Sequence, residues 1–128
     1  AELDQPHDVI RKIRVLLADD HQVMRRGLAR LLQEELDIEV VGEADDGRSA
    51  VELARQTLPD VIVMDVSMPR MNGIEATRIL STDLPDIRVI GLSMYGEADR
   101  AQAMRDAGAV AYLNKCDPSE DLIAAIRG

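Results

Sequence analysis

Polar side chains that can do chemistry stand at the ends of four apolar segments of this 128-residue chain. They are Asp19 and Asp20 after 13–18, Asp65 at the end of 60–65, Ser93 after 87–92 and Lys115 after 109–113. Three carboxylates close together raise one another's pKa values, and a divalent cation relieves that repulsion. Oxygen ligands suit Mg²⁺ in particular. The Ser93 hydroxyl and the Lys115 ammonium can then hold the oxygens of a phosphoryl group on Asp65, because aspartate is able to accept phosphate covalently.

Asp65 ends the segment that most clearly predicts a buried strand. The four residues before it, 61–64, are all apolar, which is typical of a strand covered on both faces in a parallel sheet. In open α/β sheets, ligands bind beyond the carboxyl ends of the strands. We therefore expect Asp65 to be the reactive residue and the other strands to bring its partners to it.

The elements that must position these residues alternate between strand and helix. Strands are predicted over 13–18, 38–44, 60–65, 87–92 and 109–113, and helices over 22–36, 48–58, 74–81, 97–107 and 118–127. This alternation predicts a doubly wound parallel sheet with helices on both faces. Right-handed crossovers favour the flavodoxin-like strand order 2-1-3-4-5, in which strands 1, 3, 4 and 5 are neighbours. The polar side chains at their ends should therefore converge on one rim.

Each of these residues also has a simpler interpretation when it is taken alone. Two aspartates after a strand often form only a turn and a helix cap, and the pair Asp45 and Asp46 is expected to lie in a solvated turn. His21 is expected to be a surface or first-turn residue and not a metal ligand, because no second His or Cys stands near it. Tyr112 can equally be a half-buried strand residue without a functional role. A functional site is favoured because a suitable polar residue stands at the end of each of these four strands.

The composition indicates one domain with an aliphatic core, since the chain has no Phe or Trp and only two Tyr. A net charge of −9 argues against direct binding of nucleic acid or of an anionic membrane. The single cysteine, Cys116, has no partner for an internal disulfide, which fits a reducing, cytoplasmic setting. No apolar run approaches the roughly 20 residues of a membrane span. Residues 1–12 are expected to form a tail or linker, and 13–128 the domain.

The motifs together resemble the receiver domain of bacterial two-component response regulators, over about residues 13–128. The residues that carry the resemblance are Asp19-Asp20, Asp65 with Met68-Pro69 and Gly73, Ser93, Tyr112 and Lys115. The sequences of residues 17–21, 66–77 and 122–127 are similar to those of the LuxR/NarL-type branch, whose members usually carry a helix-turn-helix output domain. The resemblance implies a CheY-like fold and a phospho-accepting regulatory domain. Such a domain is no classical enzyme, since it catalyses only its own Mg²⁺-dependent phosphorylation and dephosphorylation.

The resemblance also implies what each position does. Asp65 would take a phosphoryl group from a sensor histidine kinase or a phosphotransfer domain. Lys115 would pair with the phosphoryl oxygens. Mg²⁺, or Mn²⁺ in its place, would be held by Asp19, Asp20, Asp65 and the backbone carbonyl of Ser67. Many receivers have a cis proline after the lysine; Cys116 stands there in this chain, so a trans peptide is expected.

Phosphorylation would be passed on through Ser93 and Tyr112. Ser93 would swing to hydrogen-bond the phosphoryl group, and Tyr112 would change rotamer with it. The face made by the fourth helix, fifth strand and fifth helix would then shift and control an output domain of the parent protein, with transcription as the expected output. The family also suggests a homodimer. The domain itself is expected to bind neither nucleic acid nor membrane.

Four other interpretations remain open. The domain can be the terminal receiver of a hybrid histidine kinase, or a degenerate receiver that works by binding alone. An aspartyl-phosphate phosphohydrolase of the haloacid dehalogenase type needs a second Asp two residues after the first, where this chain has Ser67. A flavodoxin-like FMN binder would need aromatic residues around the flavin, which this chain largely lacks.

Overall fold

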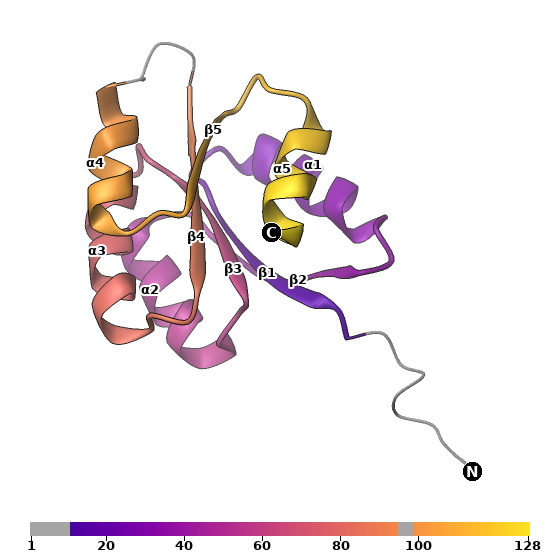
Figure 1. The fold of residues 1–128 in the computed structure, drawn as a ribbon, viewed down its shortest axis with the longest axis horizontal. Coiled ribbons are helices and arrows are strands. Elements are labelled where there is room, and N and C mark those ends of the chain that lie inside the picture. Colours follow the sequence, from indigo (N-terminus) through magenta and orange to yellow (C-terminus); the bar gives the residue numbers. More distant parts are fainter. Residues whose placement is uncertain (1–10, 95–98) are drawn as a thin grey trace.

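The predicted strands form one parallel sheet, in the order β2-β1-β3-β4-β5 (Figure 1). The computed structural model describes residues 11–94 and 99–128. Its strands are β1 (Ile13–Ala18), β2 (Ile38–Ala44), β3 (Val61–Asp65), β4 (Arg88–Ser93) and β5 (Ala111–Asn114). Its helices are α1 (Gln22–Gln33), α2 (Gly47–Thr57), α3 (Gly73–Asp83), α4 (Asp99–Ala107) and α5 (Ser119–Arg127). Helices α1 and α5 cover one face of the sheet, and α2, α3 and α4 cover the other. The flavodoxin-like, CheY-like prediction is confirmed.

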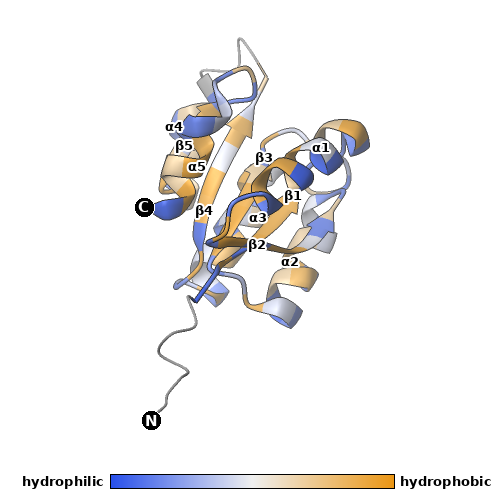
Figure 2. Cartoon of the chain, turned by 90° about the vertical axis from the view of Figure 1, so that its right-hand side faces the viewer, coloured by the Kyte–Doolittle hydropathy of each residue, from blue (hydrophilic) through white to orange (hydrophobic). Residues whose placement is uncertain are grey.

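The central strand β3 is buried along its whole length, as its apolar run predicted. Its side chains alternate between two cores: Ile62 and Met64 pack on the side of α2, α3 and α4, while Val61 and Val63 pack on the side of α1 and α5. Figure 2 shows the strands coloured mostly as hydrophobic. Because β3 lies between β1 and β4, the position of Asp65 at its carboxyl end is set by neighbours on both sides.

The first helix is shorter than predicted, and part of its predicted apolar face was wrong. It ends at Gln33, and Leu36 is 86% exposed. In the sequence, the helical spacing of Val23 with Leu28, Leu31 and Leu32 predicts a shared buried face. Val23 is nevertheless 87% exposed, whereas Ala29 and Leu32 are buried. The chain has to leave the helix early because Ile38, which begins β2, must reach the sheet.

The other boundaries lie within two residues of the prediction, and those of β1 and β2 match it. Helix α3 is longer at both ends, and at its start Asn72 and Glu75 form a reciprocal capping box. Of the predicted fourth helix, residues 97–98 lie outside the described residues. Gly108 follows the last helical residue with a φ of +121°, a conformation that glycine adopts readily at helix ends. Strand β5 starts at Ala111 instead of Ala109. None of the described helices is long and apolar enough to cross a membrane.

The prediction that Asp46 lies in a solvated turn was wrong. Asp46 is 3% exposed and is the N-cap of α2, where its carboxylate accepts a hydrogen bond from the Ser49 N–H at 2.7 Å. Its other oxygen accepts from Arg70 Nε at 2.8 Å. Arg70 lies 24 residues away in the β3–α3 loop, so the local pattern of two aspartates before a glycine could not reveal this partner. Asp45, in contrast, is exposed as expected.

The close approach of Gly73 to β3 predicts a large cost for any side chain at that position. A Cβ on Gly73 would lie 2.1 Å from the backbone oxygen of Asp65, so Gly73→Ala must displace the backbone and should lower the free energy of unfolding by about 2 kcal/mol or more. Gly27, within α1, has no atom within 4 Å of such a Cβ. Gly27→Ala is the matched control and should stabilise the protein by about 0.5–1 kcal/mol. Urea unfolding measures both; equal effects would contradict the contact.

Candidate functional site

The carboxyl ends of four strands bring the predicted site residues to one rim of the sheet. Asp65 ends β3 and Ser93 ends β4, while Asp19 directly follows β1 and Lys115 directly follows β5. The strand register keeps these ends level, since Asp65 pairs with Leu92. The Lys115 N–H donates to the Ser93 backbone oxygen at 2.8 Å, which fixes the lysine one residue beyond the sheet.

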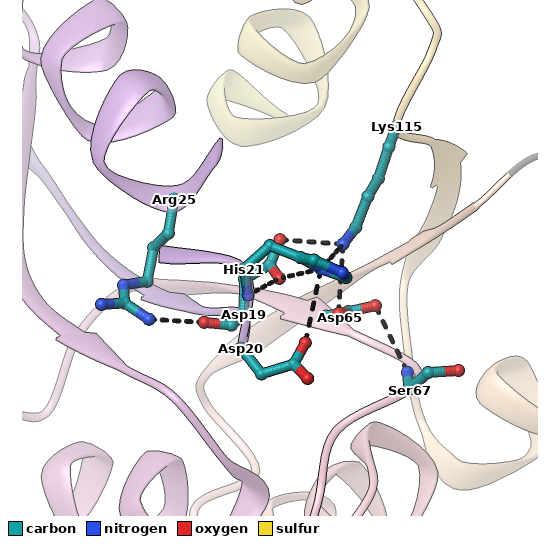
Figure 3. Close-up of polar contacts among 7 residues, drawn as sticks. All are labelled: Asp19, Asp20, His21, Arg25, Asp65, Ser67 and Lys115. Carbon is teal, nitrogen blue, oxygen red and sulfur yellow. Dashed lines mark hydrogen bonds and ion pairs between the residues drawn. The ribbon is translucent and has the colours of Figure 1, made fainter. Parts of the chain in front are cut away.

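Lys115 lies between two buried carboxylates (Figure 3). Its Nζ is 2.9 Å from Asp19 Oδ2 and 3.1 Å from Asp65 Oδ2, and its side chain is only 1% exposed. The Asp65 side chain is 2% exposed and the Asp19 side chain 8%. A buried charge is stable only when it is paired, so this lysine is the counter-ion that makes two buried aspartates tolerable.

The acidic residues also lie close enough together to share one cation. Ligand atoms of Asp19, Asp20, His21 and Asp65 all lie within 4.8 Å of one another. Asp20 is partly exposed, with a side chain 35% accessible, so the cluster is open to solvent on one side. The three carboxylates supply the hard oxygen ligands that Mg²⁺ prefers. The residues present therefore fit a magnesium site.

His21 was predicted to be a surface residue, and it is exposed, but its ring faces the acidic cluster. Nδ1 lies 3.2 Å from Asp19 Oδ1 and 3.4 Å from Asp20 Oδ1, and the side chain is 58% exposed. The backbone N–H of His21 also donates to Asp19 Oδ1 at 2.9 Å. Its position directly after two aspartates was the only sequence signal of this placement.

Arg25 is a neighbour of the site that sequence reasoning missed. From the first turns of α1 its guanidinium donates to the backbone oxygen of Asp19 at 2.6 Å (Figure 3). It also donates to Glu43 Oε1 at 2.8 Å. The side chain is 11% exposed. Arg25 thus holds the turn that presents the two aspartates. Arginines are common on helices, so its identity alone gave no signal.

The structure brings the remaining predicted residues near the rim in different ways. Ser67 lies in the β3–α3 loop, and its N–H donates to Asp65 Oδ1 at 3.3 Å. Ser93 is 3% exposed at the end of β4. Tyr112 is half-buried on β5, with its ring against Gly91 of β4, on the side of the sheet that α4 covers. Tyr112 therefore belongs to the α4–β5–α5 face that we expect to shift, and β4 separates its strand from β3, which carries Asp65.

The segment after β5 is built without a cis peptide bond. No peptide bond in the described part of the chain is cis, so the bond between Lys115 and Cys116 is trans, as expected. Two side chains shape the turn: Asp117 accepts from the Asn114 N–H at 3.0 Å, and Asn114 accepts from the Cys116 N–H at 2.9 Å.

Burial and charge set the protonation of the site. Burial raises the pKa of Asp65 to about 6, and the nearby charge of Asp19 adds to this, while Lys115 opposes it. Burial also disfavours the charged form of Asp19, but the His21 N–H and Lys115 together hold its pKa below the ordinary value. Burial works against the charged Lys115, yet its bonds to Asp19 and Asp65 keep the lysine pKa above its usual range. Lys115 thus lies between two aspartates whose pKa values are shifted in opposite directions, that of Asp19 downward and that of Asp65 upward.

The raised pKa of Asp65 predicts how stability changes with pH. The folded state binds this proton more tightly than the unfolded state, whose Asp titrates near 3.8. The stabilisation from the protonated group is therefore complete below pH 3.8 and is lost as the pH rises through about 6. In metal-free buffer, the gain in unfolding free energy on Asp65→Asn should be larger at about pH 7.5 than at about pH 5, by about 1–2 kcal/mol. Urea titrations at both pH values test this, and a pH-independent difference would contradict it.

The chain resembles one protein family over nearly its whole length. The response regulator receiver domain family matches residues 15–127. The transcriptional regulatory protein LiaR of Bacillus subtilis is 45% identical over 115 residues, which cover 90% of this chain and 54% of LiaR. The transcriptional regulatory protein DegU of Brevibacillus brevis is 41% identical over 116 residues, covering 91% of this chain and 49% of DegU. The chain thus spans about half the length of the curated relatives it matches.

Solved structures agree with this assignment. A two-component response regulator of the LuxR family from Aurantimonas superimposes with a TM-score of 0.85 at 35% identity, covering 91% of this chain and 83% of that chain. The signal receiver domain of the response regulator NarL from Mycobacterium tuberculosis gives a TM-score of 0.84 at 32% identity, covering 92% and 98%. From its fold, its rim of carboxylates and these relatives, the chain belongs to the receiver domain family of two-component response regulators, among relatives of the LuxR/NarL-type branch.

Proposed function

We propose that Asp65 is the phosphoryl acceptor of this receiver domain. The observation that carries the proposal is the pairing of Asp65 with Lys115 at the carboxyl end of the buried strand β3, beside Asp19 and Asp20. An oxygen of Asp65 forms the new bond to phosphorus, and the bond between phosphorus and the donor atom breaks. The donor atom is a histidine nitrogen of a sensor kinase or phosphotransfer domain, or the acyl oxygen of a small donor.

Lys115 and a bound cation together neutralise the negative charge of the transferred phosphoryl group. Lys115 binds phosphoryl oxygens with the ammonium that now bridges two carboxylates. Asp19, Asp20, Asp65 and the backbone carbonyl of Ser67 hold Mg²⁺, with Mn²⁺ as a substitute. When bound, the cation neutralises negative charge that would otherwise oppose the reaction. The domain acts on itself alone, in phosphorylation and dephosphorylation, and is not a classical enzyme.

We further propose that the signal leaves the site through Ser93 and Tyr112. Ser93 lies at the rim, on the strand between those of Asp65 and Tyr112. The Tyr112 ring packs on Gly91, where even a Cβ would come within 2.8 Å of it, so the ring is sensitive to small movements of β4. A rearrangement there would change the α4–β5–α5 face, which would control an output domain and a possible homodimer.

The curated relatives favour transcription as the output over the hybrid-kinase alternative, because they are transcriptional regulators of which this chain matches about half the length. In this proposal residues 13–128 are the receiver domain and 1–12 precede it as a tail or linker. The setting is cytoplasmic, where a kinase delivers the phosphoryl group, and the acidic domain itself binds neither DNA nor membrane.

Metal dependence tests the proposed function directly. The protein is incubated with acetyl phosphate and Mg²⁺, and its intact mass is measured. A gain of one phosphoryl group is expected, and excess EDTA should abolish it because the clustered carboxylates then lack their cation. A gain that persists in EDTA would contradict the role of the metal, and no gain with either acetyl phosphate or a phosphorylated kinase would contradict the acceptor role.

A further inference from the structure

We infer that Asp46 and Arg70 form a clamp that positions the β3–α3 loop, residues 66–72, beside Asp65. Both would then be positioning residues for the metal site, although Asp46 lies in the turn between β2 and α2. The inference rests on the proposed function, because Ser67 of this loop is the proposed backbone ligand of the cation. It assigns a purpose to the buried Asp46, which the site described above does not use.

The clamp attaches the loop to the first turn of α2 at two successive residues. One oxygen of the Asp46 carboxylate accepts from the Ser49 N–H, and the other accepts from Arg70 Nε at 2.8 Å. The Asp46 side chain is 4% exposed, so this ion pair is shielded on the aspartate side. The next residue, Gly47, donates its N–H to the backbone oxygen of Met71 at 2.9 Å.

The contact leaves little freedom for the loop to move. A Cβ at Gly47 would lie 2.1 Å from the Met71 oxygen, so the two backbones are in direct contact. Arg70 has a φ of +66°, a left-handed conformation that a residue with a side chain keeps only when its surroundings hold it there. The bond to Asp46 is one such restraint.

The other end of the loop is tied to the acceptor strand. The Ser67 N–H donates to Asp65 Oδ1, and the Gly73 N–H donates to the Val66 oxygen at 2.9 Å. A displacement at Arg70 has only two residues, Met68 and Pro69, across which to relax before it reaches Ser67. Loss of the clamp should therefore misplace the Ser67 carbonyl and weaken cation binding.

Charge and positioning predict opposite results when Arg70 is removed. Loss of a positive side chain near a cation site leaves cation affinity unchanged or raises it. Loss of a positioning contact lowers it. Arg55 provides a matched control, because it forms an ion pair of similar length with Asp83, 2.7 Å, and its side chain is 51% exposed compared with 64% for Arg70. That pair joins α2 and α3 near their carboxyl ends and not at the loop.

The test is the equilibrium affinity of the intact protein for Mn²⁺, followed by the electron paramagnetic resonance signal of the free ion, and for Mg²⁺ by competition. Arg70→Ala should raise the dissociation constant at least about threefold, below the range usual for direct partners of metal ligands. Arg55→Ala should leave the dissociation constant unchanged or lower it slightly. In an Asp46→Asn background, the further change Arg70→Ala should add nothing, because the clamp is already broken.

An Arg70→Ala dissociation constant equal to that of Arg55→Ala would overturn the clamp while leaving the proposed function intact. A wild-type protein that binds no Mn²⁺ would instead overturn the proposed metal site, and the clamp with it. Urea unfolding of each variant separates these outcomes from loss of the fold. Both arginines are largely exposed, so the variants should remain folded.

Discussion

The Asp65→Asn protein should gain no mass when it is incubated with Mg²⁺ and acetyl phosphate, while the wild type gains one phosphoryl group. The substitution keeps the shape of a side chain that is 2% exposed and removes only the nucleophilic oxygen and its charge. The group gained by the wild type should be released by hydroxylamine, which cleaves acyl phosphates. We expect this to be the largest effect of any single substitution, because no other group can replace the attacking atom.

Asp60→Asn is the matched control for this experiment. Asp60 precedes the same strand at its opposite end, where its carboxylate accepts a hydrogen bond from the Arg14 N–H at 2.9 Å. The Asp60→Asn protein should be phosphorylated like the wild type. Phosphorylation of the Asp65→Asn protein would mean that another carboxylate is the acceptor, and the partly exposed Asp20 would then be the first to test.

Lys115→Met should slow phosphorylation of Asp65 by about 10²-fold or more, since the loss of one preorganised charge that stabilises a transition state typically costs this much. The lysine side chain is 1% exposed and contacts both Asp19 and Asp65, so no water can take its place without rearrangement. Its loss should also raise the pKa of Asp65 further, because Lys115, together with the Ser67 N–H, lowers that pKa against the effect of burial. The initial rate of mass gain at saturating Mg²⁺ measures the effect.

The chain has one other lysine, Lys12, at an exposed position before β1. Lys12→Met is the matched control, because it makes the same change of charge away from the site. Its rate should equal that of the wild type. If Lys115→Met lost its activity only below about pH 7 and regained the wild-type rate above it, the lysine would act through the Asp65 pKa alone. A rate that stays low at every pH is the result that our proposal requires.

The sequence by itself determined the buried central strand and the alternation of strands and helices. The apolar run before Asp65 determined a buried strand, because a fully covered strand has no polar side to alternate. The alternation of strand and helix then determined a parallel sheet, and with it the convergence of Asp19, Asp65 and Lys115 at one rim, since parallel strands end on the same side. These features follow from patterns along the chain, whereas the backbone carbonyl of Ser67 as a cation ligand was implied only by the family resemblance.

The tertiary structure decided the features that depend on partners far apart in the sequence. Whether a polar side chain is buried depends on what covers it, so the solvated turn expected at Asp46 proved to be a buried cap bound to Arg70. The exposed Val23 and the early end of α1 were set by how that helix meets the sheet and not by its own periodicity. Arg25 holds the acidic turn through a backbone oxygen, a contact that no side-chain motif encodes. The pKa of about 6 for Asp65 likewise requires its burial and its distances to Lys115 and Asp19, which exist only in the folded chain.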